Sequence, residues 1–416
     1  MPPPADIQTI SKRGIALLVT LVILALLAIF MTEFAFETKL ETRGIQNYQA
    51  SFKAKNAVKS MFKAVLEGLE KQDEFKFFRV YLENLQKNFS EFSGKDCTLL
   101  NPCKPERLIA GVIADFPDVI FYTPFIRPID HLYNLNRIQT PPFRTVNPEA
   151  KSDVRLANQF INIFNAGNYN TTQKSDATVF IQNPQLGINQ ILPIYAAIFD
   201  WLDKNNEIYD SDVYGTIGAE REYYAGTKPA VSIKNGYLDI LSEVQLIPLI
   251  SQEQIPLAFW EIKFTTYPVG RKYNRSSNFS LINPRININL ATSAEIIEFL
   301  EQFDQNTVYF ASYSSKDYEN IYEQDLFQKR NEIAEELTKL PRSKLNNKDI
   351  KNKLKNITQY YSKTNDFFTA NSFWYKIHLK TEIDNVIAEV KAVVSVERKE
   401  ETGKVTKLSI HSFWLR

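Results

Sequence analysis

The hydrophobic pattern begins with an uninterrupted apolar run near the start of the chain. Ile15 to Met31 contains no charged residue, and Thr20 is its one polar residue. As a helix this run would be about 26 Å long at ~1.5 Å per residue, close to the thickness of a bilayer's hydrocarbon core. Lys12 and Arg13 precede it, so the positive-inside rule places the N-terminus in the cytoplasm. The sequence therefore predicts a single-pass anchor with the remainder of the chain outside.

Apolar residues then continue at helical spacing. Between residues 40 and 69 they recur at intervals of three and four, and no proline interrupts residues 15–72. We expect one long helix, embedded in lipid at its start and packed on a globular domain at its end. The apolar positions of this second part are Ile45, Tyr48, Phe52, Val58, Met61, Phe62, Val65 and Leu69.

The rest of the chain changes period twice. Residues 105–135 hold short apolar runs split by prolines, which predicts strands. Helical spacing follows in residues 154–164, 191–202 and 238–244, and Thr292 with Glu295 fits a capping box before a helix over 295–303. Residues 374–380, 386–396 and 408–415 alternate as strands, with Thr402-Gly403 as a hairpin turn. The order predicts an α+β protein in which a helical domain is inserted into an antiparallel sheet.

Composition narrows the class of function. Apolar residues make up 44% of the 416 residues and aromatic residues 13%, which is typical of a folded protein. A formal net charge of +1 provides no overall field for nucleic acid, so no nucleic-acid partner is expected. The chain lacks the usual nucleophile, zinc-protease and nucleotide-binding motifs, and two of its three histidines, His378 and His411, lie in strand patterns. We expect that it is not an enzyme.

The two cysteines, Cys97 and Cys103, are separated by five residues that include Asn-Pro. They lie outside the membrane on the predicted topology, where disulfides persist. A local disulfide is favoured over a metal pair because no histidine or second cysteine pair lies nearby.

Acidic residues are dense after the predicted helix 191–202. Carboxylate and amide oxygens are the ligands that Ca²⁺ takes, and the spacing does not match an EF-hand. Absence of nearby cysteine or histidine favours Ca²⁺ over zinc. The alternative is a solvated loop with helix caps. The candidate ligands are Asp200, Asp203, Asn205, Glu207, Asp210, Asp212, Glu220 and Glu222.

The start of the chain resembles a type IV prepilin leader. Lys12-Arg13-Gly14 abuts the apolar run directly, and no Ala-x-Ala-like cleavage site follows Met31. The resemblance implies that a prepilin peptidase cuts after Gly14 and leaves Ile15 as the first residue. The alternative is a plain signal anchor that is not processed.

Several segments spread over nearly the whole chain carry a second resemblance. They are Asp130 to Asn136, Asp200 to Asp203, Gly218 to Glu220, Tyr223-Tyr224, Asn235 to Leu238, Leu241 to Val244 and Ile286 to Glu295. The most specific is the Asp-Trp-Leu-Asp element followed by Gly-Ala-Glu. Together these segments resemble the K-type minor pseudopilins of bacterial type II secretion. The chain departs from the family pattern at His131-Leu132, Tyr133 and Leu290, where the family has Gly-Arg, phenylalanine and threonine.

The resemblance implies a pilin-like fold and a role at the tip of the type II secretion pseudopilus, priming assembly for protein export. Expected partners are the I-type and J-type minor pseudopilins, prepilin peptidase, the inner-membrane assembly platform and the lipid bilayer, with the globular part in the periplasm. The runner-up function is a signal-anchored periplasmic binding protein or substrate adaptor outside any filament. The predicted layout is a leader (1–14), an N-terminal helix (15–72), the first part of a pilin-like domain (73–136), an inserted helical domain (137–280), a helical segment with a Lys-rich linker (281–357) and C-terminal strands (358–416).

Overall fold

The computed structural model describes residues 7–71, 116, 118–122, 125–138, 151–165, 186–211, 216–226, 232–253, 255–267, 284–302, 330–339, 348–350, 352–353, 367–398 and 405–416, with side chains of α1 described from residue 16 onward. Cys97, Cys103 and Asp212 lie outside these ranges, so the predicted disulfide stays a prediction.

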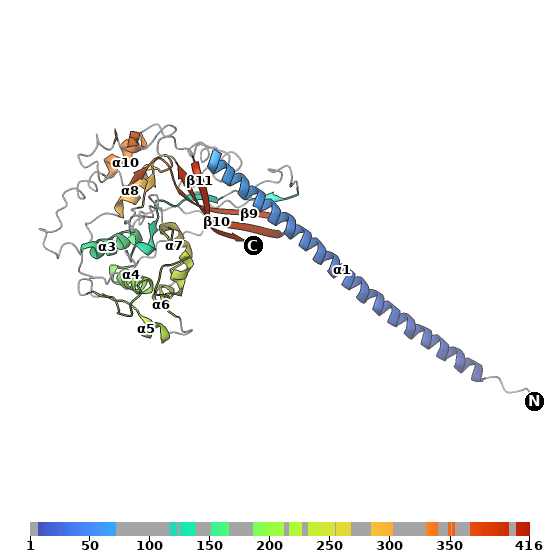
Figure 1. Cartoon of the computed structure of the whole chain (residues 1–416). Coiled ribbons are helices and arrows are strands. Elements are labelled where there is room, and N and C mark those ends of the chain that lie inside the picture. The colour runs from blue at the N-terminus through green and yellow to red at the C-terminus, as the bar shows by residue number, and fades with distance from the viewer. Residues whose placement is uncertain are drawn as a thin grey trace, which may run out of the picture.

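The N-terminal helix α1 (Ile7–Lys71) is continuous and has two different surfaces along its length. Its first half projects away from the rest of the molecule (Figure 1). Large apolar side chains such as Leu17 and Phe30 are exposed there. Its second half buries Ala54, Ala57 and Val58 completely. By length and composition this helix is a candidate membrane anchor near the N-terminus.

The second half of α1 lies on an antiparallel sheet. The sheet order is β1 (Ile120–Phe121), β9 (Trp374–Ile383), β10 (Val386–Arg398) and β11 (Val405–Leu415), and β2 (Phe125–Pro128) also pairs with β9. β9 and β10 are joined by Asp384 and Asn385, whose φ angles of 48° and 66° fit the two-residue turn that favours hairpins. Sequence analysis predicted both long hairpin strands but did not single out this turn.

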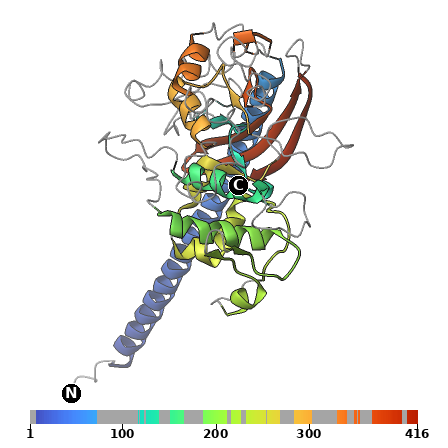
Figure 2. The same ribbon diagram turned by 90° about the vertical axis from the view of Figure 1, so that its left-hand side faces the viewer.

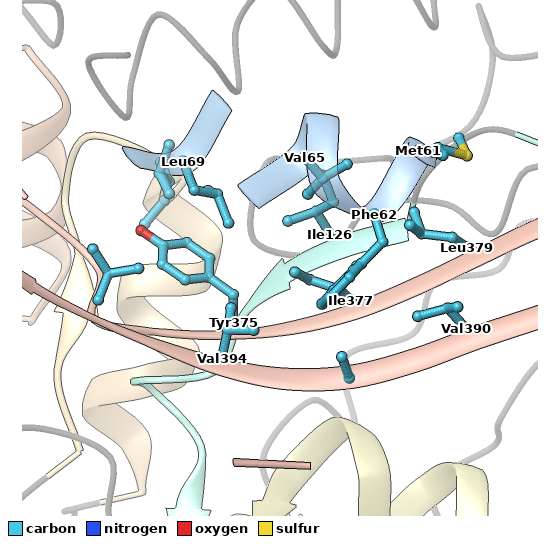
Figure 3. Close-up of a cluster of buried hydrophobic side chains, with 14 of the residues drawn as sticks. Met61, Phe62, Val65, Leu69, Ile126, Tyr375, Ile377, Leu379, Val390 and Val394 are labelled. Atoms are coloured by element: carbon cyan, nitrogen blue, oxygen red, sulfur yellow. The ribbon is translucent and has the colours of Figure 1, made fainter. Parts of the chain in front are cut away.

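The contact between α1 and the sheet forms the first hydrophobic core. Figure 3 shows Met61, Phe62, Val65 and Leu69 of α1 above Ile377 and other apolar side chains of the sheet. A hydrogen bond also joins β9 to α1, because the Thr381 hydroxyl donates to the Ala54 carbonyl at 3.0 Å. The predicted fold class, α+β with a long N-terminal helix packed on an antiparallel sheet, is confirmed by this arrangement.

Shorter elements complete this core. β7 (Ile286–Asn287) pairs in parallel with β8 (Phe368–Thr369), and α8 (Ser293–Glu301) packs with α10 (Arg330–Thr338). The predicted capping box is confirmed: the Thr292 side chain accepts from the Glu295 N–H, and Glu295 accepts from the Thr292 N–H at 2.8 Å. Residues 286–287, which precede this capping box, form a short strand because they pair with β8.

A second core is built by the helices in the middle of the chain (Figure 2). Its aromatic rings pack against one another at tilted or edge-to-face angles, and the ring centroids of Phe164 and Phe259 lie 5.0 Å apart. Residues 241–246, in the region expected to be α-helical, form a 3₁₀ helix. The predicted domain boundaries remain predictions. The elements of this part are β3 (Tyr133–Asn134), η2 (Leu135–Arg137), α3 (Lys151–Asn165), α4 (Ile188–Leu202), β4 (Asp210–Ser211), β5 (Thr216–Ile217), α5 (Arg221–Ala225), η3 (Leu241–Leu246), α6 (Pro248–Gln252), α7 (Leu257–Lys263) and β6 (Phe264–Thr265).

Polar side chains fasten the helical part to the sheet. Arg127 of β2 is buried and donates to the carbonyls of Glu261 and Ile262 at 3.3 and 3.1 Å. Lys376 of β9 pairs with the Glu261 carboxylate at 2.6 Å. Asp130 accepts from the backbone N–H groups of residues 373 and 374. These bonds hold α7 and the segment that follows β2 against the sheet.

Candidate metal centre in the helical part

Three of the predicted acidic ligands meet at one point. One carboxylate oxygen from each of Asp200, Asp203 and Glu220 lies within 4.8 Å of the others. The three residues are 0%, 2% and 3% exposed, respectively. Buried carboxylates so close to one another could serve together as ligands of a cation.

Local structure explains this convergence. Asp200 lies in the last turn of α4, and Asp203 is the residue that ends that helix, with its N–H bonded to the Phe199 carbonyl at 3.0 Å. Glu220 is the N-cap of α5. Between them, Gly218 passes so close to Asp200 that an added Cβ would lie 1.9 Å from a carboxylate oxygen. Only glycine fits at that position without a shift of the backbone or of Asp200.

Several oxygens at this point have no hydrogen-bond partner among the described residues. They are Oδ2 of Asp200, Oδ1 of Asp203 and both carboxylate oxygens of Glu220. The other oxygen of Asp200 accepts from the Tyr209 N–H at 3.0 Å, and the other oxygen of Asp203 accepts from the Asn205 amide at 2.8 Å. One side of each aspartate is therefore fixed by the protein, and the other side stays available to a ligand.

Without a counter-ion, the ionised form of these carboxyl groups is unfavourable. Burial raises the pKa of Asp200 to about 8, and the charges of Glu220 and Asp203 add to this effect. Burial also raises the pKa of Asp203 to about 7, with a contribution from Glu207. The pKa of Glu220 rises to about 7 for the same reason, with a contribution from Asp203. A cation would reverse these shifts because it stabilises the ionised forms.

The loop beside the three carboxylates is itself ordered by amide side chains. Asn205, a predicted ligand, donates to Asp203 and accepts from the Glu207 N–H. Asn235 donates to the Asn205 carbonyl at 3.2 Å and has a φ of 48°. These contacts fix the conformation of the loop beside the three convergent carboxylates.

The remaining predicted ligands lie elsewhere or outside the described residues. Glu207, Asp210 and Glu222 are exposed, and none belongs to the group of three convergent carboxylates. Asp212 is outside the described residues. The predicted processing residues Gly14 and Ile15 are described only as part of the α1 backbone.

Sequence reasoning missed two contributors, Gly218 and Asn235, as parts of this site. Both occur in segments that resemble the K-type family, and Gly218 directly precedes the Ala-Glu pair that ends in a ligand. A glycine two residues before a candidate ligand was the available signal for a close backbone approach.

Chemically, the centre is an all-oxygen set of three anions with no histidine or cysteine among its members. Such a set suits a hard divalent cation, and Ca²⁺ accepts the irregular geometry that loop-borne carboxylates provide. The three side chains could therefore supply ligand oxygens to such a cation.

No family model and no curated protein matches the chain. The long helix on an antiparallel sheet defines a pilin-like α+β class of protein. A solved structure similar to this chain is the GspK-GspI-GspJ complex from the enterotoxigenic Escherichia coli type 2 secretion system. The likeness covers 89% of this chain and 99% of that chain, at 12% sequence identity and a TM-score of 0.42.

Proposed function

We propose that this protein is a membrane-anchored minor pseudopilin that caps the tip of a type II secretion pseudopilus and primes its assembly for protein export across the outer membrane. The observation that carries the proposal is the division of α1 into an exposed apolar half and a half buried on the sheet. A free helix with that surface needs lipid or neighbouring apolar helices to cover it. A filament subunit first held in the inner membrane meets both environments.

The residue at position five of the mature chain supports a place at the tip. After cleavage behind Gly14, Val19 would occupy this position, where most pilin-like subunits carry a glutamate that pairs with a neighbour's N-terminal amine. An unpaired carboxylate in the membrane is costly. The first subunit of a filament lacks one neighbour, so an apolar residue suits it.

The position of the helical part also supports capping. It lies beside the sheet at the end of the molecule opposite the N-terminus of α1 (Figure 1). A further subunit stacked above this one would collide with the helical part. The helical part therefore favours a position at the end of the filament over a position within it.

Proposed partners follow from the same helix. Ile45, Tyr48 and Phe52 form a stripe that is exposed in this chain, between the anchor and the buried half of α1. Covering each large apolar side chain would contribute about 1.5–3 kcal/mol. We propose that the I-type and J-type pseudopilins cover this stripe, that prepilin peptidase and the assembly platform act on the anchor, and that the globular part is periplasmic.

N-terminal analysis of the full chain purified from membranes tests this function. We expect the mature protein to begin at Ile15, and Gly14→Leu to remain unprocessed while Gly14→Ala is processed poorly. An intact Met1, or a cut beyond Met31, would contradict the pseudopilin role. Co-purification with the I-type and J-type subunits is the second measurement, and no complex at micromolar concentration would count against a tip role.

We further propose that Asp200, Asp203 and Glu220 hold a Ca²⁺ ion that stabilises the helical part. The support is their convergence, their burial and their unpartnered oxygens. The ion would supply a positive charge that compensates the carboxylates between α4 and α5. It would have a structural role and take no part in a reaction.

A further inference from the structure

The last strand, β11, forms one edge of the sheet. Among the described residues it pairs with β10 alone. Glu389 and Arg416 exchange two backbone hydrogen bonds, of 3.2 and 3.1 Å. Because hydrogen-bonded and non-hydrogen-bonded pairs alternate in antiparallel strands, the backbone groups of Phe413 and Leu415 point away from β10. The end of β11 therefore presents two residues whose N–H and C=O groups face outward.

Apolar side chains beside this edge are only half covered. The register places Ile410 opposite Val394 and Phe413 opposite Ala392, so both lie on the sheet face that α1 covers. The ring of Phe413 lies 5.3 Å from that of Phe62 in α1. Yet Ile410 and Phe413 remain 48% and 46% exposed, because α1 lies mainly over β9 and β10. The hydrophobic core thus continues to the edge without a cover.

Charge decides between two kinds of occupant. Residues 405–416 contain no acidic residue, and both Lys407 and Arg416 are exposed. Glu397 of β10 lies 4.0 Å from Lys407 in a solvent-exposed pair, which compensates that charge weakly. If two copies of β11 paired antiparallel about residues 411–412, Lys407 of one copy would lie opposite Arg416 of the other. Like charges directly opposite are destabilising. The edge therefore disfavours a second copy and favours a strand with acidic residues.

We propose that the edge of β11 binds an extended strand from a neighbouring pseudopilin, one that carries acidic residues beside apolar ones. Its backbone would pair with Phe413 and Leu415, its apolar side chains would cover Ile410 and Phe413, and its acidic residues would meet Lys407 and Arg416. This inference rests on the proposed function for its choice of partner. It adds a site of strand addition to the helix contacts of α1.

Two variants at one position test strand addition. Phe413→Val removes the ring and keeps the outward N–H, whereas Phe413→Pro removes both. Proline is tolerated on an edge strand where its nitrogen faces outward. Full-chain protein in detergent would be titrated with the I-type and J-type pseudopilins of the same bacterium. We expect the proline variant to bind at least tenfold more weakly than the valine variant, with similar melting temperatures for the two.

A crosslinking experiment covers the case in which the proline variant does not fold. A photoreactive benzoylphenylalanine at Ile410 should crosslink to one of the two partners. The same group at Ile387, which is equally exposed but lies on the other face of the sheet, should not. Equal binding by the valine and proline variants, or no preference for residue 410, overturns strand addition while the pseudopilin role stands. If the unaltered chain forms no complex, the pseudopilin role fails and this inference fails with it.

Discussion

Two regions of this molecule bury charge, and they compensate it in opposite ways. Arg127, between the sheet and α7, is buried but donates to two backbone carbonyls. Burial lowers the pKa of Arg127 to about 10, against the opposing effect of Glu295, Glu298 and Glu261. It therefore stays a cation at neutral pH. Its positive charge is balanced by groups of the same chain.

The carboxylates at the end of α4 have no such balance. Asp200, Asp203 and Glu220 are as buried as Arg127, and their nearest charges have their own sign. None of them joins a salt bridge within the described part of the chain. The first region therefore contains its own counter-charges, whereas the second brings like charges together without a described cation paired to them.

The largest expected effect comes from removing the compensated charge. Arg127→Met leaves the carbonyls of Glu261 and Ile262 without donors in a buried place. We expect a loss of about 3–5 kcal/mol in the free energy of unfolding. Lys376→Met is the matched control: its ion pair with Glu261 is partly exposed, so the expected loss is about 1 kcal/mol or less. Denaturant unfolding of the full chain in detergent measures both, and equal losses would refute the contrast.

Acidity should stabilise the second region in calcium-free buffer. The folded-state pKa values of about 7 to 8 lie above those of the unfolded chain, so the folded state keeps protons that the unfolded state has released. Stability should then be highest near pH 5 and fall as the pH rises to 8. Each carboxyl that retains its proton in the folded state adds to the slope of this loss.

The pH series is measured by thermal melting in chelator. A control with Asp200→Asn, Asp203→Asn and Glu220→Gln together should flatten the dependence in this range. A melting temperature that increases from pH 5 to 8 in the unaltered chain would have the wrong sign and would contradict the buried, uncompensated state.

Calcium should remove the same destabilisation at neutral pH. Binding to the folded state alone stabilises by about 2.7 kcal/mol at a hundredfold excess over Kd. We expect a higher melting temperature with millimolar calcium than with chelator at pH 7.5, and a smaller gain at pH 5, where protons compete for the oxygens. Calorimetry checks binding directly. Identical midpoints with no calorimetric signal would show that no calcium binds there.

The sequence predicted the core around α1 more fully than it predicted the candidate metal centre. The spacing of Val58, Phe62 and Val65 predicted a buried helix face, because helical period and burial are linked locally. The capping box at Thr292 could also be predicted, because its two residues are only three positions apart in the sequence. The Asp384-Asn385 turn, by contrast, was not singled out although its residue types suit positive φ.

The candidate site was only partly accessible from sequence. Eight acidic and amide residues near one another in the chain were indistinguishable by composition. The structure selects three, because the end of α4 and the start of α5 turn Asp200 and Glu220 inward and leave Asp210 and Glu222 in solvent. That selection depends on the path of the chain through Gly218, where backbone and carboxylate nearly touch. No periodicity encodes such a tertiary approach.

The smallest expected effect is also the most specific one. Asp200→Asn removes one charge from the centre and keeps an oxygen that can accept from the Tyr209 N–H. In chelator at pH 7.5 we expect the variant to be no less stable than the unaltered chain, because the cost of burying an ionisable carboxyl at residue 200 is gone. With calcium it should gain less stability, because a ligand charge is missing. Asp210→Asn is the control, since Asp210 is exposed and should leave the calcium response unchanged. Paired melting curves with and without calcium measure all three proteins. A calcium response that falls equally in both variants would mean that surface charge, and not the buried group of three, attracts the ion.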